Sequence, residues 1–138
     1  MILIIDCGAG TTRNIEEIVD DTCDFKSVPL LDFKKEALDG VKGVIISSAS
    51  ILLTEVDPDP IIARLDWIKE TELPVLGINF GHVLVGMIFD GYPSRTRNSG
   101  DWQLIEAYED CILFNRLPNE IEMREDVAET ISIPPGFE

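Results

Sequence analysis

The stretch LPVLGINFGH, from Leu73 to His82, predicts a tight strand-to-helix turn. Val75 to Ile78 is a short apolar run that favours a buried strand, and His82 to Phe89 has the apolar composition of a buried helix. Asn79 therefore falls on the turn itself, which is the place of the nucleophile in folds that carry one on such a turn. A carboxamide cannot attack a carbonyl carbon, so Asn79 supplies no nucleophile.

Strand-like and helix-like segments alternate from Met1 to Phe89. Besides the strand above, strands are expected at Ile2 to Asp6, Phe25 to Val28 and Val44 to Ser47. Besides the helix above, helices are expected at Asn14 to Asp20, at Phe33 to Leu38 with Asp32 as N-cap, and from Asp57 onward. Alternation of strand and helix predicts a parallel sheet, because each helix returns the chain to the start of the next strand.

The chain changes character after this region. Gly91 to Asp101 (GYPSRTRNSGD) is polar and glycine-rich, which predicts a loop. Shorter strands, forming an antiparallel extension, are expected at Trp102 to Tyr108, Cys111 to Phe114, Glu120 to Arg124 and Glu129 to Ile133. The whole pattern predicts an α/β fold of three layers, flavodoxin-like, with helices on both faces of a mainly parallel sheet. One domain over residues 1–138 is expected.

Length and charge limit the classes of protein that fit. The 138 residues suit one globular domain, and 45% of them are hydrophobic. The formal net charge of −15 would repel phosphate backbones and anionic lipids, so neither nucleic acid nor a membrane is an expected partner. No apolar run reaches the roughly 18 residues of a membrane span, and Met1 leads into a strand-like run instead of a basic signal-peptide segment.

The cysteines indicate a reducing environment. Cys7, Cys23 and Cys111 are odd in number and lack C-x-x-C spacing, which argues against a disulfide framework and against a zinc site. A cytoplasmic protein without a metal or other cofactor is therefore expected.

The segment Leu73 to His82 resembles the nucleophile motif of class I glutamine amidotransferases, which reads P-V-L-G-I-C-x-G-H-Q. The cysteine of that motif is the nucleophile, and Asn79 stands in its place here. Gly77, Gly81 and His82 match the motif. Val83 replaces the glutamine and has no side-chain hydrogen bond to offer.

Two upstream segments extend the resemblance. Met1 to Arg13 is similar to the family's first strand, and Gly43 to Ser50 is similar to its third strand with the oxyanion loop that follows. That loop is glycine-rich in the family, whereas here it reads Ser47-Ser48-Ala49-Ser50. Glycines let backbone N–H groups turn toward a developing oxyanion, so residues such as Ser48 and Ala49 make that geometry harder to reach.

The closing segments resemble stretches that come shortly before the family's catalytic histidine and glutamate. They are Leu117 to Glu120 and Ile133 to Glu138. The resemblance implies that the sequence stops before that pair. Its only histidine, His82, follows the nucleophile position on the helix and is not the family's general base. Nucleophile, base and orienting acid are then all missing from the expected triad.

The loop containing Cys7, Gly8, Gly10 and Thr11 lies where open α/β sheets place ligands, between the carboxyl end of a strand and the start of a helix. It matches neither standard phosphate-binding motif, so a structural turn is the main interpretation and ligand binding the alternative. The Cys7 thiol is an alternative nucleophile, because a helix N-terminus lowers a thiol pKa, although a buried inert cysteine is the commoner case.

Structural roles account for the remaining candidates. A neutral His82 imidazole can hydrogen-bond neighbouring backbone and hold the turn. Asparagine tolerates positive φ, which explains Asn79 without catalysis. A group of acidic residues has an alternative interpretation as metal ligands, but a solvated surface is favoured because no calcium-loop motif is present. These residues are Asp57, Asp59, Glu120, Glu122, Glu125 and Asp126.

Three functions remain open. The favoured one is a glutamine amidotransferase-like protein without glutaminase activity, which has a regulatory, scaffolding or binding role toward a synthetase-type protein or as a homodimer. The second is an active enzyme of the same superfamily that uses other residues, such as Cys7, or residues of a partner. The third is a module that binds a small molecule or anion at the Cys7 to Thr12 loop and the Ser47 to Ser50 loop.

Overall fold

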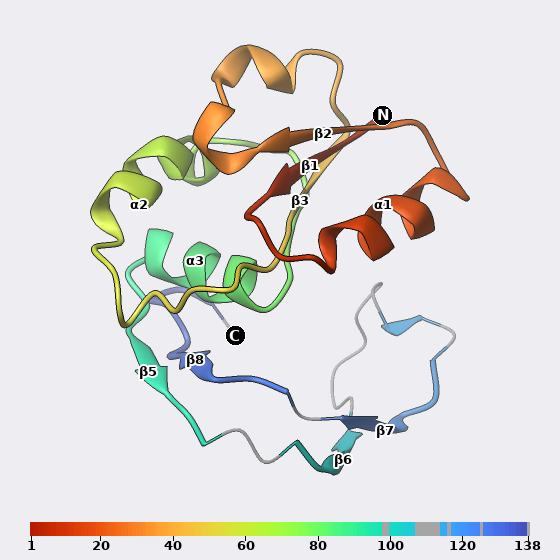
Figure 1. Cartoon of the computed structure of the whole chain (residues 1–138), viewed down its shortest axis with the longest axis vertical. Helices are drawn as coiled ribbons and strands as arrows, with labels where there is room; N and C mark the ends of the chain where they lie inside the picture. The colour runs from red at the N-terminus through yellow and green to blue at the C-terminus, as the bar shows by residue number, and fades with distance from the viewer. Residues whose placement is uncertain (98–99, 107–113, 116, 125, 138) are drawn as a thin grey trace. The chain divides into compact units, whose positions relative to one another are not determined.

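The computed structural model describes residues 1–97, 100–106, 114–115, 117–124 and 126–137 (Figure 1). The chain divides into two units. The first consists of Met1–Arg95 together with Glu129–Glu138, and the second of Thr96–Ala128. No helix in these described ranges is long and apolar enough to cross a membrane.

A parallel sheet forms the centre of the first unit, with the strand order β2-β1-β3-β4. Its strands are β1 (Ile2–Asp6), β2 (Phe25–Pro29), β3 (Gly43–Ile46) and β4 (Val75–Gly77). Ile5 lies opposite Val28 of β2 and Ile46 of β3, and Ile46 in turn lies opposite Gly77. The sequence prediction of these four strands is confirmed to within one residue at each end.

Helices cover both faces of this sheet (Figure 1). Helix α1 (Thr12–Asp20) connects β1 to β2, whereas α2 (Asp59–Leu65) and the 3₁₀ helix η3 (Asp66–Lys69) connect β3 to β4. The two connections run in opposite directions across the sheet, so right-handed crossovers place α1 on one face and α2 on the other. Strand alternation points the fully buried Ile4 to the α1 face. The predicted α/β layer arrangement is confirmed.

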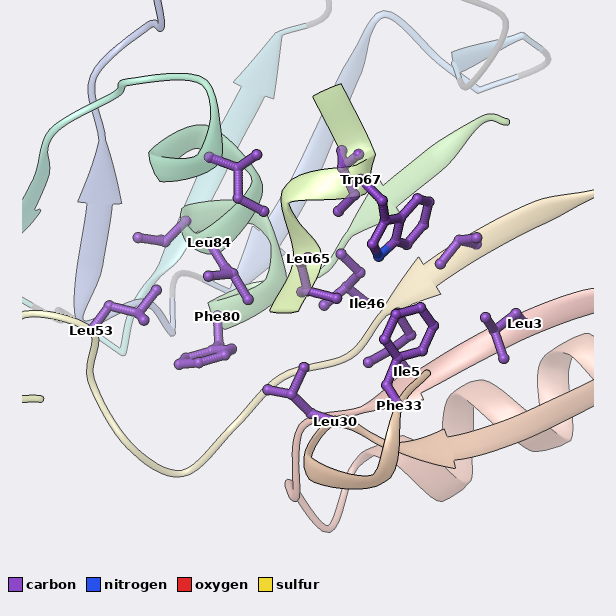
Figure 2. Close-up of a cluster of buried hydrophobic side chains, with 14 of the residues drawn as sticks. Leu3, Ile5, Leu30, Phe33, Ile46, Leu53, Leu65, Trp67, Phe80 and Leu84 are labelled. Carbon is purple, nitrogen blue, oxygen red and sulfur yellow. The ribbon is translucent and has the colours of Figure 1, made fainter. Parts of the chain in front are cut away.

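The main core lies on the face that carries α2 and α3 (Phe80–Ile88), as Figure 2 shows. Leu3 and Ile5 of β1 and Ile46 of β3 are completely buried there. The Phe33 and Trp67 rings stack above them, with their centroids 5.7 Å apart. Complete burial of each aliphatic side chain contributes about 1.5–3 kcal/mol, so this face supplies most of the unit's apolar stabilisation.

The connection from β2 to β3 departs from the prediction. The helix expected at Phe33 to Leu38 is replaced by two 3₁₀ turns, η1 (Leu30–Asp32) and η2 (Lys35–Leu38). Asp32 ends the first turn and does not cap a helix, because Phe33 is extended with φ −61° and ψ 133°. That backbone places the Phe33 ring in the core, where only 3% of the residue is exposed, so tertiary packing outweighs the local helical pattern.

A short antiparallel ribbon completes the first unit. Strand β5 (Pro93–Arg95) pairs with β8 (Glu129–Ile131). The prediction of a loop across Gly91 to Asp101 is therefore wrong at β5, whose polar sequence gives no strand signal. Ile131 packs against α3 and the turn after it so closely that a Cβ on Gly91 would lie 3.0 Å from its side chain.

The second unit contains an antiparallel hairpin of β6 (Trp102–Glu106) and β7 (Glu120–Arg124). This confirms the predicted antiparallel extension at these segments, although β6 is described only as far as Glu106. The strand expected at Cys111 to Phe114 lies outside the described residues except for Phe114, which is in a 3₁₀ turn.

Candidate functional site

Asn79 occupies the turn between β4 and α3, where the sequence predicts it. Its backbone has φ 51° and ψ −108°. The positive φ fits the expected tolerance of asparagine, but this ψ lies outside the left-handed helical region to which that tolerance applies. Such a conformation costs about 1–3 kcal/mol and persists only where the surrounding structure imposes it. The residue type thus explains only part of the observed geometry.

Two glycines impose this geometry by letting α3 begin directly against the sheet. A Cβ on Gly77 would lie 2.6 Å from the backbone nitrogen of His82. A Cβ on Gly81 would meet the carbonyl group of Ile46 in β3, at 2.9 Å from its carbon. The same Ile46 carbonyl accepts a 3.0 Å hydrogen bond from the Ile78 N–H. The close approach leaves no room for an unstrained turn, and Asn79 absorbs the strain.

The exposed side chains at this elbow have no activating hydrogen-bond partner among the residues that the structure describes. Asn79 and His82 are both exposed. Asn79 makes no side-chain cap bond to α3, and neither side chain hydrogen-bonds another described residue. The hydrogen bond expected to let His82 hold the turn is thus not formed there. The elbow presents a carboxamide and an imidazole to solvent, without a nucleophile–base pair.

Ser47 is a buried junction between two loops, and its donors do not face solvent. Ser47 is completely buried. Its N–H donates to the Ile5 carbonyl at 3.0 Å, and its hydroxyl donates to the Ser48 carbonyl at 3.2 Å. The same hydroxyl oxygen accepts the Cys7 N–H at 2.9 Å, and it lies 3.0 Å from the Thr12 hydroxyl, whose single proton it shares with the Asp6 carboxylate. Both donors of Ser47 are therefore committed to the fold and unavailable to an oxyanion.

Ser48 and Ala49, in the rest of the oxyanion-loop equivalent, are also directed toward the protein, whereas Ser50 is not. The Ser48 carbonyl accepts a 3.2 Å bond from the Ala9 N–H, and the Ser48 hydroxyl donates to the Ala49 carbonyl at 3.5 Å. Ala49 packs against the core, and Ser50 is exposed. This segment ties the loop after β3 to the loop after β1.

Asp6 organises the loop after β1 from within. Its Oδ1 accepts bonds from the Gly8 N–H at 2.9 Å and from the Thr12 hydroxyl at 2.7 Å. Gly8 has φ 95°, which a residue with a side chain would strain to adopt. Gly10 and Thr11 are exposed, and Thr11 makes no side-chain cap bond to α1. The Gly8 and Ala9 N–H groups are already taken by the Asp6 carboxylate and the Ser48 carbonyl, which favours the structural-turn interpretation.

The Cys7 thiol is held in its protonated form. Burial, reinforced by the neighbouring Asp6 carboxylate, raises its pKa to about 12 although the Ser47 hydrogen bond acts in the opposite direction. The nucleophile in thiol chemistry is the thiolate, so little reactive species is present at neutral pH. The helix-terminus effect expected from the sequence is outweighed by desolvation. Cys23 is exposed, and Cys111 lies outside the described residues.

The acidic residues considered as metal ligands show no ion site in the part of the chain that the structure describes. Among the residues with described positions, no three His, Cys, Asp or Glu side chains converge to hold an ion. Asp57 and Asp59 are exposed neighbours, and the Asp57 carboxylate accepts the Asp59 N–H at 3.1 Å. Glu125 is outside the described ranges.

A buried carboxylate near the site was not identified from the sequence. Glu129 of β8 is only 7% exposed and accepts backbone N–H groups from the loop after β3. Arg95, its neighbour across the ribbon, pairs with Glu55 of the same loop. Glu129 lies 76 positions after Leu53 and 75 after Thr54 in the sequence, and no local sequence pattern predicts contacts over such separations. Both loops at this edge of the sheet are therefore fixed by polar side chains.

The chain is similar in sequence to a GMP synthase. A GMP synthase [glutamine-hydrolyzing] from Thermomicrobium roseum is 28% identical over 142 residues, which cover 99% of this chain. The chain spans 26% of the length of that relative. No protein-family model matches the chain.

Two solved structures share the fold. A candidate GMP synthase component from Thermoplasma acidophilum superposes with a TM-score of 0.81 at 22% identity over 97% of this chain and 68% of its own. A glutamine amidotransferase from Thermotoga maritima superposes with a TM-score of 0.74 at 17% identity over 97% of this chain and 63% of its own. At these identities the similarity establishes the architecture of the chain.

Proposed function

We propose that this chain is a glutamine amidotransferase-like protein that does not hydrolyse glutamine and that acts by binding a synthetase-type protein. The observation that carries the proposal is Asn79 at the strained elbow. Strain of this kind is typical of active sites, where it presents a reactive group. Here the backbone keeps the strained conformation, while the side chain has no electron pair suited to attack.

The surrounding groups support the loss of glutaminase chemistry. An acyl transfer needs a base within reach of the nucleophile and N–H donors aimed at the oxyanion. His82 is exposed and makes no bond to Asn79, and the donors of Ser47 are engaged inside the fold. A thiol at residue 79 alone would therefore lack its activator.

The proposed partner follows from the comparison with the Thermomicrobium protein, whose name joins GMP synthesis to glutamine hydrolysis. The chain matches only 26% of that protein, which leaves most of its length for other activities. We extend this by analogy to a synthetase-type partner for the present chain, with a regulatory or scaffolding role, in the cytoplasm, and with 1–138 acting as one glutaminase-like domain. Self-association into a homodimer is the alternative form of binding.

Two alternative functions receive less support. An enzyme using Cys7 requires a thiolate, and the raised pKa of Cys7 opposes one. An anion-binding module at the loop after β1 would place its ligand against the Asp6 carboxylate, which already accepts the Gly8 N–H. Like charges at that position disfavour anion binding.

The proposal is tested with the synthetase portion of the Thermomicrobium GMP synthase as the probe. Calorimetric titration with this chain should show saturable binding, and the probe should turn over with an ammonium salt but not with glutamine in its place. Asn79→Ala should leave both results unchanged, because the side chain is exposed and unbonded. Absence of binding, or glutamine-driven turnover that Cys7→Ser abolishes, would reject the proposal.

A further inference from the structure

The loop after β3 is held in place by a buried carboxylate. The Glu129 Oε2 accepts the Leu53 N–H at 2.9 Å, and its Oε1 accepts the Thr54 N–H at 2.6 Å. Burying a carboxylate is costly unless its oxygens are hydrogen-bonded, and both of these oxygens are. The two bonds therefore fix the backbone of this loop to β8.

Three further contacts fix the same loop between Leu53 and Glu55. Arg95 pairs with the Glu55 carboxylate, and its Nε donates to the Thr54 hydroxyl at 3.3 Å. The Leu53 side chain is 2% exposed and belongs to the same buried cluster as Phe80 of α3 (Figure 2). Since Arg95 and Glu129 lie directly opposite each other in the β5–β8 ribbon, the polar contacts of both residues with the loop come from one element.

The residues on either side of this fixed segment are displayed to solvent. Ile51 is 48% exposed and Val56 is 37% exposed, although Leu53 between them is buried. Residues 51–57 are here named the clamped loop. Because its backbone is already ordered, a partner that contacts Ile51 and Val56 does not have to order it on binding. An apolar pair on a fixed loop is thus suited to recognition.

The charge of the surface indicates the chemistry of the occupant. Asp57 and Asp59 are exposed after Val56, residues 51–60 contain no basic side chain, and Arg95, which contacts the loop, is already paired with Glu55. A second copy of the chain, with net charge −15, would oppose like charges at this loop. A segment that carries Lys or Arg beside aliphatic residues would instead match both the carboxylates and the apolar pair.

We propose that the clamped loop is a preformed docking surface for a basic, aliphatic segment of a partner protein. This inference rests on the proposed partner-binding function and specifies its contact surface. Glu129 and Arg95 are positioning residues for it, since they act through the loop backbone and the Glu55 and Thr54 side chains.

The surface is tested with synthetic peptides as defined probes and with amide chemical shifts of the intact, isotope-labelled chain as the readout. A peptide of alternating Lys and Leu should shift the amides of residues 51–57 saturably. Peptides of alternating Lys and Ser, or Glu and Leu, should not, because each lacks one half of the proposed chemistry. Shifts spread over the whole acidic surface, or equal shifts with the Lys–Ser peptide, would overturn the proposal.

Substitutions separate recognition from positioning. The double change Ile51→Ser and Val56→Ser should weaken the Lys–Leu peptide about tenfold by removing exposed aliphatic area. Ile18→Ser is the matched control, because Ile18 is 69% exposed on α1, away from the loop. Equal weakening by the control, or none by the double variant, would contradict the assignment.

The positioning role has its own readout in hydrogen exchange. In Glu129→Gln one carboxylate acceptor becomes an amide donor, so exchange of the Leu53 or Thr54 N–H should accelerate while strand amides of β1 stay protected. Arg95→Ala, at an exposed ion pair, provides a milder test should Glu129→Gln unfold. Unchanged exchange and affinity in both variants would exclude positioning. A negative peptide result leaves calorimetric binding of the synthetase probe intact, so the two proposals fail separately.

Discussion

Replacing Asn79 by glycine should stabilise the protein. The observed φ of 51° and ψ of −108° are the mirror image of an extended conformation that is open to L residues, so glycine adopts them without strain. Relief of strain contributes about 1–3 kcal/mol, and the added freedom of glycine in the unfolded chain costs about 0.5–1 kcal/mol. The exposed side chain has no bonds to lose among the described residues. A net gain of about 1 kcal/mol is expected.

Urea denaturation of the two proteins measures this gain as a shift in the midpoint at constant slope. Asn14→Gly is the matched control, because the same chemical change occurs at an exposed position of α1 with ordinary helical backbone. It should destabilise the protein by about 0.3 kcal/mol or more. If Asn79→Gly proved destabilising, or if both variants shifted the midpoint alike, the account of strain at the elbow would be refuted.

Three further outcomes are expected. Gly81→Ala should destabilise the fold by about 1–3 kcal/mol or prevent folding, because the added Cβ would meet the Ile46 carbonyl. Gly10 has open space around it, so Gly10→Ala should change the denaturation midpoint little. Equal effects of the two substitutions would contradict the packing argument. Ser47→Ala should cost about 1–3 kcal/mol in thermal or urea unfolding, because the Cys7 N–H loses its acceptor, and a neutral result would show the network to be dispensable. Iodoacetamide should label the exposed Cys23 well before Cys7 at pH 8. Labelling of Cys7 should increase only as the pH approaches 12. Rapid labelling of Cys7 at neutral pH would mean that its thiol is not desolvated.

The raised pKa of Cys7 also sets the sign of a pH effect. The thiol ionises near its ordinary pKa of 9.0 in the unfolded chain and near 12 in the fold. Its contribution to stability is therefore complete below pH 9 and declines as pH rises toward 12. Cys7→Ser should reduce that alkaline decline.

Local pattern was sufficient for the parallel sheet and the elbow. Ile2–Asp6 and Val75–Gly77 are apolar segments followed by turn and helix signals, and such segments form buried strands in any α/β context. The glycine spacing at Gly77 and Gly81 placed Asn79 on the turn. The strained ψ could not be predicted, because it results from contact between α3 and Ile46 of another strand.

Features that depend on contacts between residues far apart in the sequence could not be predicted from local patterns. Phe33 was assigned to a helix by its neighbours, yet burial against Trp67 draws it into extended backbone. The family resemblance places Ser47 in the oxyanion-loop equivalent, but it does not reveal that residues of the β1 loop enclose the Ser47 hydroxyl. Glu129 is one of many acidic residues in a chain of net charge −15, and only folding brings it to the Leu53 and Thr54 amides.

Ammonia release from glutamine by the purified chain tests most directly whether the elbow lacks glutaminase activity. The account predicts no release above the uncatalysed rate for the unaltered chain, and the same baseline for Asn79→Ala. Release that Asn79→Ala abolishes would show that residue 79 takes part in the chemistry and would contradict the loss of activity inferred from its carboxamide.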